Sequence, residues 1–171
     1  MIRVVALLTW IAINASCYGQ SNPFEKIDYD SLVGYNFALR DTRVQTILGK
    51  DSTLDRTTIL PGTKLTGSQS KSLIRIITDT LTYGGASYAC FEPKHAFIFY
   101  KHSSIVALVE ICFACNNVRS TPTIPAVDYY ARKSDHQLSN YGFSKNGAKR
   151  LVDFCKKIGL EVAGIPTRPG D

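Results

Sequence analysis

The chain has 171 residues and a formal net charge of +6 at pH 7. This length suits one domain with a buried hydrophobic core. No internal repeat, low-complexity tract or interior linker divides the sequence, which excludes repeat and multidomain architectures. The lysines and arginines are spread along the chain and no motif combines them with aromatic residues, so we expect no nucleic-acid partner.

The first residues have the layout of a secretory signal peptide. A short basic start with Arg3 precedes an apolar run over residues 4–13, and small and polar residues follow. The apolar run is about half of the roughly 20 residues that a membrane-spanning helix needs, so we expect no transmembrane span. We predict that residues 1–19 are removed and that the protein is exported, to the periplasm, to the outer surface or as a secreted protein.

The sequence leaves two forms of the mature N-terminus open. Cleavage after Gly19 releases Gln20 as the first residue, whereas Cys17 is placed to serve as the lipid anchor of a bacterial lipoprotein. In the first form residues 20–171 make a single globular domain, and its tail over residues 165–171 is predicted to be frayed.

The elements in chain order predict an α+β fold. Residues 22–25 combine an N-cap asparagine with a proline at the first helical position, which favours a short helical turn. Apolar and polar residues alternate over 32–39, as in a strand, and shorter strands are expected at 44–48 and 57–60. Pro61-Gly62 is expected to end this group of strands.

Two main helices are expected, at about residues 68–80 and 144–158. Thr66 and Gln69 have the spacing of a capping box before the first helix, and leucines and isoleucines follow at helical intervals. Ser144 is the expected N-cap of the second helix, which also carries an apolar stripe. Tyr83-Gly84-Gly85 is expected to end the first helical region.

A β-hairpin over residues 96–113 is expected between the helices, because both arms are rich in aromatic and β-branched residues. If His102 and Ser103 form a two-residue loop, continuous pairing puts Phe97 opposite Leu108. The same register places His95 directly opposite Glu110. It also puts one apolar set on a single face of the hairpin: Ile98, Tyr100, Ile105, Val109 and Ile111.

Extended further, this register brings Cys90 opposite Cys115. Directly opposite residues lie about 4.5–5.5 Å apart, which is within the range of a disulfide, so we favour a bond between these two cysteines. A bond between Cys112 and Cys115 would require a turn, since three residues of strand span about 10 Å. Cys155 lies on the apolar stripe of the last helix, either as a buried free thiol or as a partner of Cys112.

Two alternatives use the same stretch for chemistry. Cys90, His95, Cys112 and Cys115 supply three thiolates and an imidazole, which could hold zinc or copper, although an oxidising compartment favours disulfides over free thiolates. Alternatively, Cys112, His95 and Glu110 could act as nucleophile, base and orienting group of a thiol enzyme. The remaining interpretation of His95 and Glu110 is a half-buried pair beside a core cysteine.

The pattern Cys90-Phe-x-Pro-x-His95 followed by Ile111-Cys-Phe-x-Cys115 resembles that of a group of small uncharacterised exported bacterial proteins. Tyr83-Gly-Gly before it, and Ser120-x-Pro122 and Gly142-Phe-Ser-Lys after it, extend the resemblance over most of the predicted mature chain. The resemblance implies export and a single domain, and it brings no activity, cofactor or catalytic residue.

The function expected from the sequence is therefore that of a non-enzymatic exported domain. It is stapled by cysteines and binds a partner in the cell envelope or outside the cell. No cofactor is expected, and the metal site and the thiol enzyme remain the alternatives.

Overall fold

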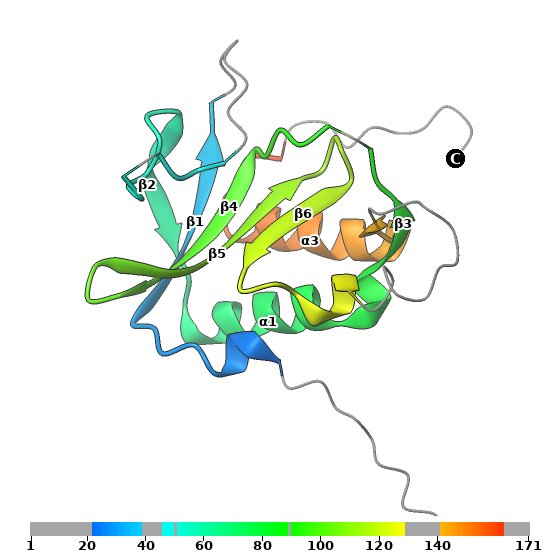
Figure 1. Cartoon of the computed structure of the whole chain (residues 1–171), viewed down its shortest axis with the longest axis horizontal. Helices are drawn as coiled ribbons and strands as arrows, with labels where there is room; N and C mark the ends of the chain where they lie inside the picture. Colours follow the sequence, from blue (N-terminus) through cyan, green and yellow to red (C-terminus); the bar gives the residue numbers. More distant parts are fainter. Residues whose placement is uncertain (1–21, 39–45, 50, 89, 129–140, 163–171) are drawn as a thin grey trace, which may run out of the picture.

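The computed structural model describes residues 22–38, 46–49, 51–88, 90–128 and 141–162. Within this part a five-stranded antiparallel sheet forms the centre of the molecule, with two helices behind it (Figure 1). This confirms the α+β fold. The predicted signal peptide, the alternative lipid anchor at Cys17 and the predicted tail over residues 165–171 lie outside the described residues. No described helix has the length and apolar character needed to cross a membrane.

The strand order of the main sheet is β2-β1-β4-β5-β6, and every neighbouring pair is antiparallel. A second sheet of two short strands pairs β3 with β7. The strands are β1 (Ser31–Phe37), β2 (Thr58–Lys64), β3 (Tyr83–Ala86), β4 (His95–Lys101), β5 (Ser104–Cys112), β6 (Asn117–Thr121) and β7 (Tyr141–Phe143).

Local capping signals account for the helices, which lie within a residue or two of their predicted positions. α1 (Gly67–Thr78) begins with a complete capping box between Thr66 and Gln69. α3 (Lys145–Lys157) begins after Ser144, whose side chain accepts the N–H of Gly147. The short 3₁₀ helices η1 (Pro23–Glu25) and η2 (Thr80–Thr82) precede β1 and β3.

The sheet separates two hydrophobic clusters. On the helix face, side chains such as Phe97 and Val109 pack with Leu73 of α1 and Leu151 of α3. On the opposite face, Ile98 packs with other strand residues beneath the connection that contains Ile47, Leu48 and Leu54. Because both faces of β4 are covered, five consecutive residues from His95 to Phe99 are buried.

The hairpin has the predicted loop but not the predicted register. His102 and Ser103 have φ values of 46° and 67°, as the two-residue hairpin turn requires. Tyr100 pairs with Ile105 as expected, but a β-bulge at Val106 shifts all later pairs by one residue. Phe97 therefore faces Val109 instead of Leu108, and His95 faces Ile111 instead of Glu110.

The bulge also divides the apolar set that was predicted to share one face. Ile98, Tyr100 and Ile105 belong to the cluster away from the helices, whereas Val109 and Ile111 face α1 and α3. The extra residue allows Ile105 to pack with Tyr100 while later residues of β5 supply the main core. A one-residue shift moves each side chain to the other face, so the prediction was wrong from Val106 onward.

Two further boundaries differ from expectation. β2 does not end at Pro61-Gly62 but continues to Lys64, which is possible because β2 is an edge strand and can accommodate a proline. Gly84-Gly85 does not end the first helical region but lies in β3, paired with β7. Of the strand expected at residues 44–48, positions 44 and 45 lie outside the described residues, and Leu48 forms an isolated bridge with Leu54.

Candidate functional site

A disulfide joins Cys90 to Cys115, with 5.7 Å between their Cα atoms, and confirms the favoured pairing. The pairing was predicted correctly although the predicted hairpin register was wrong, because Cys90 lies in the connection before β4 and not in a paired strand. The connection is held against the far end of β5 by two backbone hydrogen bonds. Tyr88 N–H donates to the Cys115 carbonyl at 2.9 Å, and Lys94 N–H donates to the Ile111 carbonyl at 3.2 Å.

Cys112 lies beside this disulfide as a free thiol that is only 1% exposed. β5 ends at Cys112 and the chain turns directly afterwards, so that the Cys115 N–H donates to Cys112 Sγ at 3.2 Å. Asn116 holds this turn by donating to the carbonyls of Ala86 and Phe143 on the two strands of the small sheet. The turn that a close approach of Cys112 and Cys115 requires is therefore present.

His95 lies on the helix face, away from Cys112 and Glu110. Its Nε2 is 2.8 Å from the Glu161 carbonyl, so this nitrogen donates, and the ring meets Phe113 edge-on at 5.2 Å between centroids. Nδ1 is buried without a hydrogen-bond partner among the described residues. Burial lowers the pKa of His95, and the positive charge of Lys94 lowers it further, whereas the hydrogen bond to the Glu161 carbonyl raises it.

Glu110 is buried on the opposite face of the sheet. One of its oxygens accepts the N–H of Ile47 at 2.5 Å, and the Thr46 side chain also hydrogen bonds to the carboxylate. Burial raises the pKa of Glu110, while these two hydrogen bonds and the charge of Arg119 act in the opposite direction. Glu110 thus ties the connection before β2 to the sheet.

The positions of His95, Glu110 and the cysteines assemble neither the predicted metal site nor the predicted thiol-enzyme site in full. The predicted juxtaposition of His95 with Glu110 was wrong because of the bulge, so the side chains of the proposed thiol enzyme are not assembled. The predicted metal ligands Cys90, Cys112 and Cys115 are brought together, but two of them are in the disulfide and His95 points to the other face. Over the described ranges, no group of three or more histidine, cysteine, aspartate or glutamate side chains could hold a metal ion.

Cys155 is a second free thiol, fully buried where α3 packs on the sheet. Burial raises its pKa to about 12, so it stays protonated and behaves as a small apolar side chain. Cys112 belongs to a separate cluster with Phe91 and Cys115, and the alternative bond between Cys112 and Cys155 is not formed.

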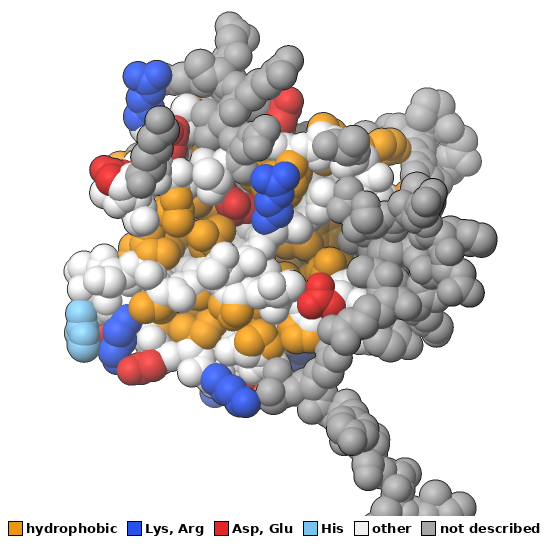
Figure 2. All heavy atoms as spheres, in the orientation of Figure 1, with side chains coloured by type: hydrophobic (Ala, Val, Ile, Leu, Met, Phe, Trp, Pro, Cys, Tyr) orange, Lys and Arg blue, Asp and Glu red, His pale blue; other side chains and the backbone are white. Residues whose placement is uncertain are grey.

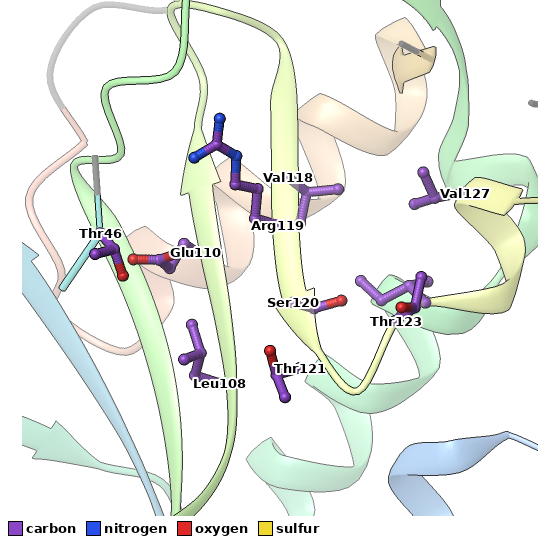
Figure 3. A pocket seen from close by; sticks show the side chains of 10 residues that line it. Thr46, Leu108, Glu110, Val118, Arg119, Ser120, Thr121, Thr123 and Val127 are labelled. Atoms are coloured by element: carbon purple, nitrogen blue, oxygen red, sulfur yellow. The ribbon is translucent and has the colours of Figure 1, made fainter. Parts of the chain in front are cut away.

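A cavity of about 450 Å³ lies along β6, the last strand of the main sheet. Figure 3 shows its two sides: Glu110 points toward Thr46 on the β5 side, and Ser120 points toward Thr123 on the other. Its wall combines hydroxyl groups with apolar side chains and two charged residues. The lining residues are Thr46, Leu108, Glu110, Val118, Arg119, Ser120, Thr121, Thr123, Ile124 and Val127.

Arg119 supplies the exposed charge of this cavity. Its guanidinium lies 4.0 Å from the centroid of the Phe91 ring, a cation–π contact that holds the group in place. Glu110 is its direct cross-strand partner, yet no carboxylate of the described residues lies within ion-pair distance of Arg119. Arg119 therefore presents a positioned donor group that can take a carboxylate in a bidentate manner.

The outer edge of β6 has no neighbouring strand among the described residues. The Ile111 carbonyl accepts a hydrogen bond from the Lys94 N–H, so the backbone polar groups of Ile111 point toward β4. Backbone polar groups alternate in direction along a strand, so those of Glu110 point toward its partner Arg119 on β6. Val118 and Ser120 consequently direct their N–H and C=O groups outward. The Val118 N–H is occupied by the Asn117 side-chain oxygen at 2.8 Å, which leaves Ser120 as the open donor.

Figure 2 shows hydrophobic side chains in the hollow beside β6, whereas lysine and arginine side chains lie singly over this face. The sequence did not reveal this site, because Arg119 and Ser120 lie in a short strand that was not predicted. The polar residues at every second position, Asn117, Arg119 and Thr121, were the sequence signal that could have predicted this strand.

Comparisons of the chain with protein-family models, with curated proteins and with solved structures found no match.

Proposed function

We propose that this protein is a non-enzymatic binding module that takes an extended, acidic segment of a partner protein along the outer edge of β6. The observation that carries this proposal is the Arg119 guanidinium, positioned on Phe91 and without an ion-pair partner in the described part of the chain. An added strand obtains affinity from main-chain hydrogen bonds and specificity from side chains on alternate positions.

The edge and the cavity support this mode of binding together. Ser120 offers an outward N–H and C=O, and the Val118 carbonyl lies two residues before it on the same edge. Val127 is partly exposed in the cavity and can contact a side chain of the added strand, whereas Val118 and Ile124 are buried parts of the cavity wall. A carboxylate on the segment would meet Arg119, and the formal net charge, +6 for the full chain and +5 once residues 1–19 with Arg3 are removed, favours an acidic partner at long range.

The compartment belongs to the same proposal. The basic, apolar and small-residue order of the first 19 residues supports export, and the Cys90–Cys115 bond suits an oxidising environment. The partner is then a protein of the cell envelope or the extracellular space.

Selection of seven-residue peptides from a random display library tests the proposal without presuming a sequence. We expect selected peptides to be enriched in aspartate and glutamate and to bind the Arg119→Gln variant at least about tenfold more weakly, the value of one hydrogen-bonded charge. Arg75→Gln is the matched control, because it removes the same charge from an exposed position of α1. Selected peptides without acidic residues, or equal affinities for both variants, would refute the proposal.

A further inference from the structure

The free thiol of Cys112 is placed next to a disulfide that it can attack. Cys112 Sγ lies 3.2 Å from the backbone nitrogen of Cys115, and Cys115 Sγ is only three bonds from that nitrogen. Rotation about the Cα–Cβ bonds of the two cysteines is therefore enough to change the distance between their sulfurs. Cys112, Cys115 and Phe91 form a small cluster of their own, apart from the two larger cores.

We infer that Cys112, Cys115 and Cys90 form a thiol–disulfide exchange centre. The Cys112 thiol gives its proton to water, and the resulting thiolate attacks Cys115 Sγ. A bond forms between the sulfurs of Cys112 and Cys115 while the bond between Cys115 and Cys90 breaks, and the Cys90 thiolate leaves and takes a proton from water. The step conserves one disulfide and one thiol, so it needs no oxidant or reductant.

The surroundings of the three sulfurs favour this direction of attack. The Cys115 N–H already donates to Cys112 Sγ, and a backbone N–H is a suitable partner for a thiolate sulfur. The turn after β5 is fixed by Asn116, which keeps Cys112 and Cys115 together. Cys90, by contrast, lies at an exposed position of the connection before β4, where a leaving thiolate meets water.

The exchange converts a buried thiol into an exposed one. Before the step the free thiol of this centre is Cys112, which solvent barely reaches, and after it the free thiol of the centre is Cys90 at the surface. The released Cys90 can then form a mixed disulfide with a partner thiol. Because Phe91 follows Cys90 directly and carries the Arg119 guanidinium, release also loosens the support of that group.

Alkylation of the oxidised full chain at pH 8 with N-ethylmaleimide, followed by peptide mass mapping after an acid quench, tests the exchange. We expect the label on Cys90 together with a new Cys112–Cys115 disulfide, at a rate that does not depend on reagent concentration once exchange is limiting. Cys112→Ser should abolish the labelling of Cys90, whereas Cys155→Ser, at the other buried free thiol, should leave it unchanged.

The wild-type map decides the question even if a variant folds poorly. Label on Cys112 with the Cys90–Cys115 bond intact would overturn the inference, because it would show that Cys112 reacts with the reagent instead of the disulfide. A map in which neither Cys90 nor Cys112 is labelled after native-state incubation, while Cys112 and Cys155 react after unfolding, would overturn it as well. Persistent Cys90 labelling in folded Cys112→Ser would exclude Cys112 as the attacking group.

Discussion

Removal of the Cys90–Cys115 bond should lower the stability of the domain substantially. The two residues are separated by 25 positions, and the loop-entropy relation for this length gives about 3.5 kcal/mol at 25 °C. For a domain of this size each kcal/mol corresponds to about 2–4 °C in Tm, so the expected loss is about 7–14 °C. The variant to use is Cys90→Ser with Cys115→Ala, because position 90 is exposed and position 115 is buried.

Thermal unfolding followed by circular dichroism, with and without reductant, measures this effect. Reductant should lower the Tm of the wild type toward that of the double variant and should leave the double variant unchanged. A double variant that melts within about 2 °C of the oxidised wild type would refute the entropic argument. If a chelator destabilised the wild type while reductant did not, a metal ion and not the disulfide would be the staple.

Three other perturbations test the packing and the buried ionisable groups. Gly147→Ala should destabilise the fold by about 1–3 kcal/mol in chemical denaturation, because the added Cβ would lie 2.0 Å from the Thr82 carbonyl oxygen. Gly67→Ala is the control: its added Cβ meets open space, so this variant should be neutral or stabilising. The pKa of Glu110 is raised in the folded state, so this residue contributes stability below pH 4.5, its ordinary pKa, and the contribution is lost as pH rises through the folded pKa. Glu110→Gln should remove this loss of stability, and parallel stability–pH profiles of wild type and variant would argue against the assignment. His95 has a lowered pKa, so stability should fall as pH drops below its ordinary value of 6.5, and an unchanged profile in His95→Gln would contradict this assignment.

Local signals predicted the helices well. The capping box of Thr66 and the N-cap at Ser144 depend on neighbouring residues only, and both helices begin at these caps. The disulfide was also within reach, because Cys90 and Cys115 lie just beyond the two arms of one hairpin. The two-residue loop at His102 and Ser103 brings these arms together.

The register of the hairpin could not be obtained from the same signals. Residues of β5 from Ile105 onward are almost continuously apolar, so no alternation marks the bulge at Val106. Because of the bulge, His95 pairs with Ile111, and the side chains of His95 and Glu110 lie on opposite faces of the sheet. The cavity was beyond prediction for a different reason, since it arises where β6 meets residues 123–127, and their relative position is set by the whole sheet.

Amide hydrogen exchange at β6, with and without a selected acidic peptide, measures whether the peptide adds as a strand to this edge. An added strand must accept the outward N–H of Ser120, so the peptide should slow exchange at Ser120. Exchange at Arg119, which already faces β5, should change little. A peptide that binds with no change in exchange at Ser120 would contradict the account, because the edge of β6 would then not be the binding site.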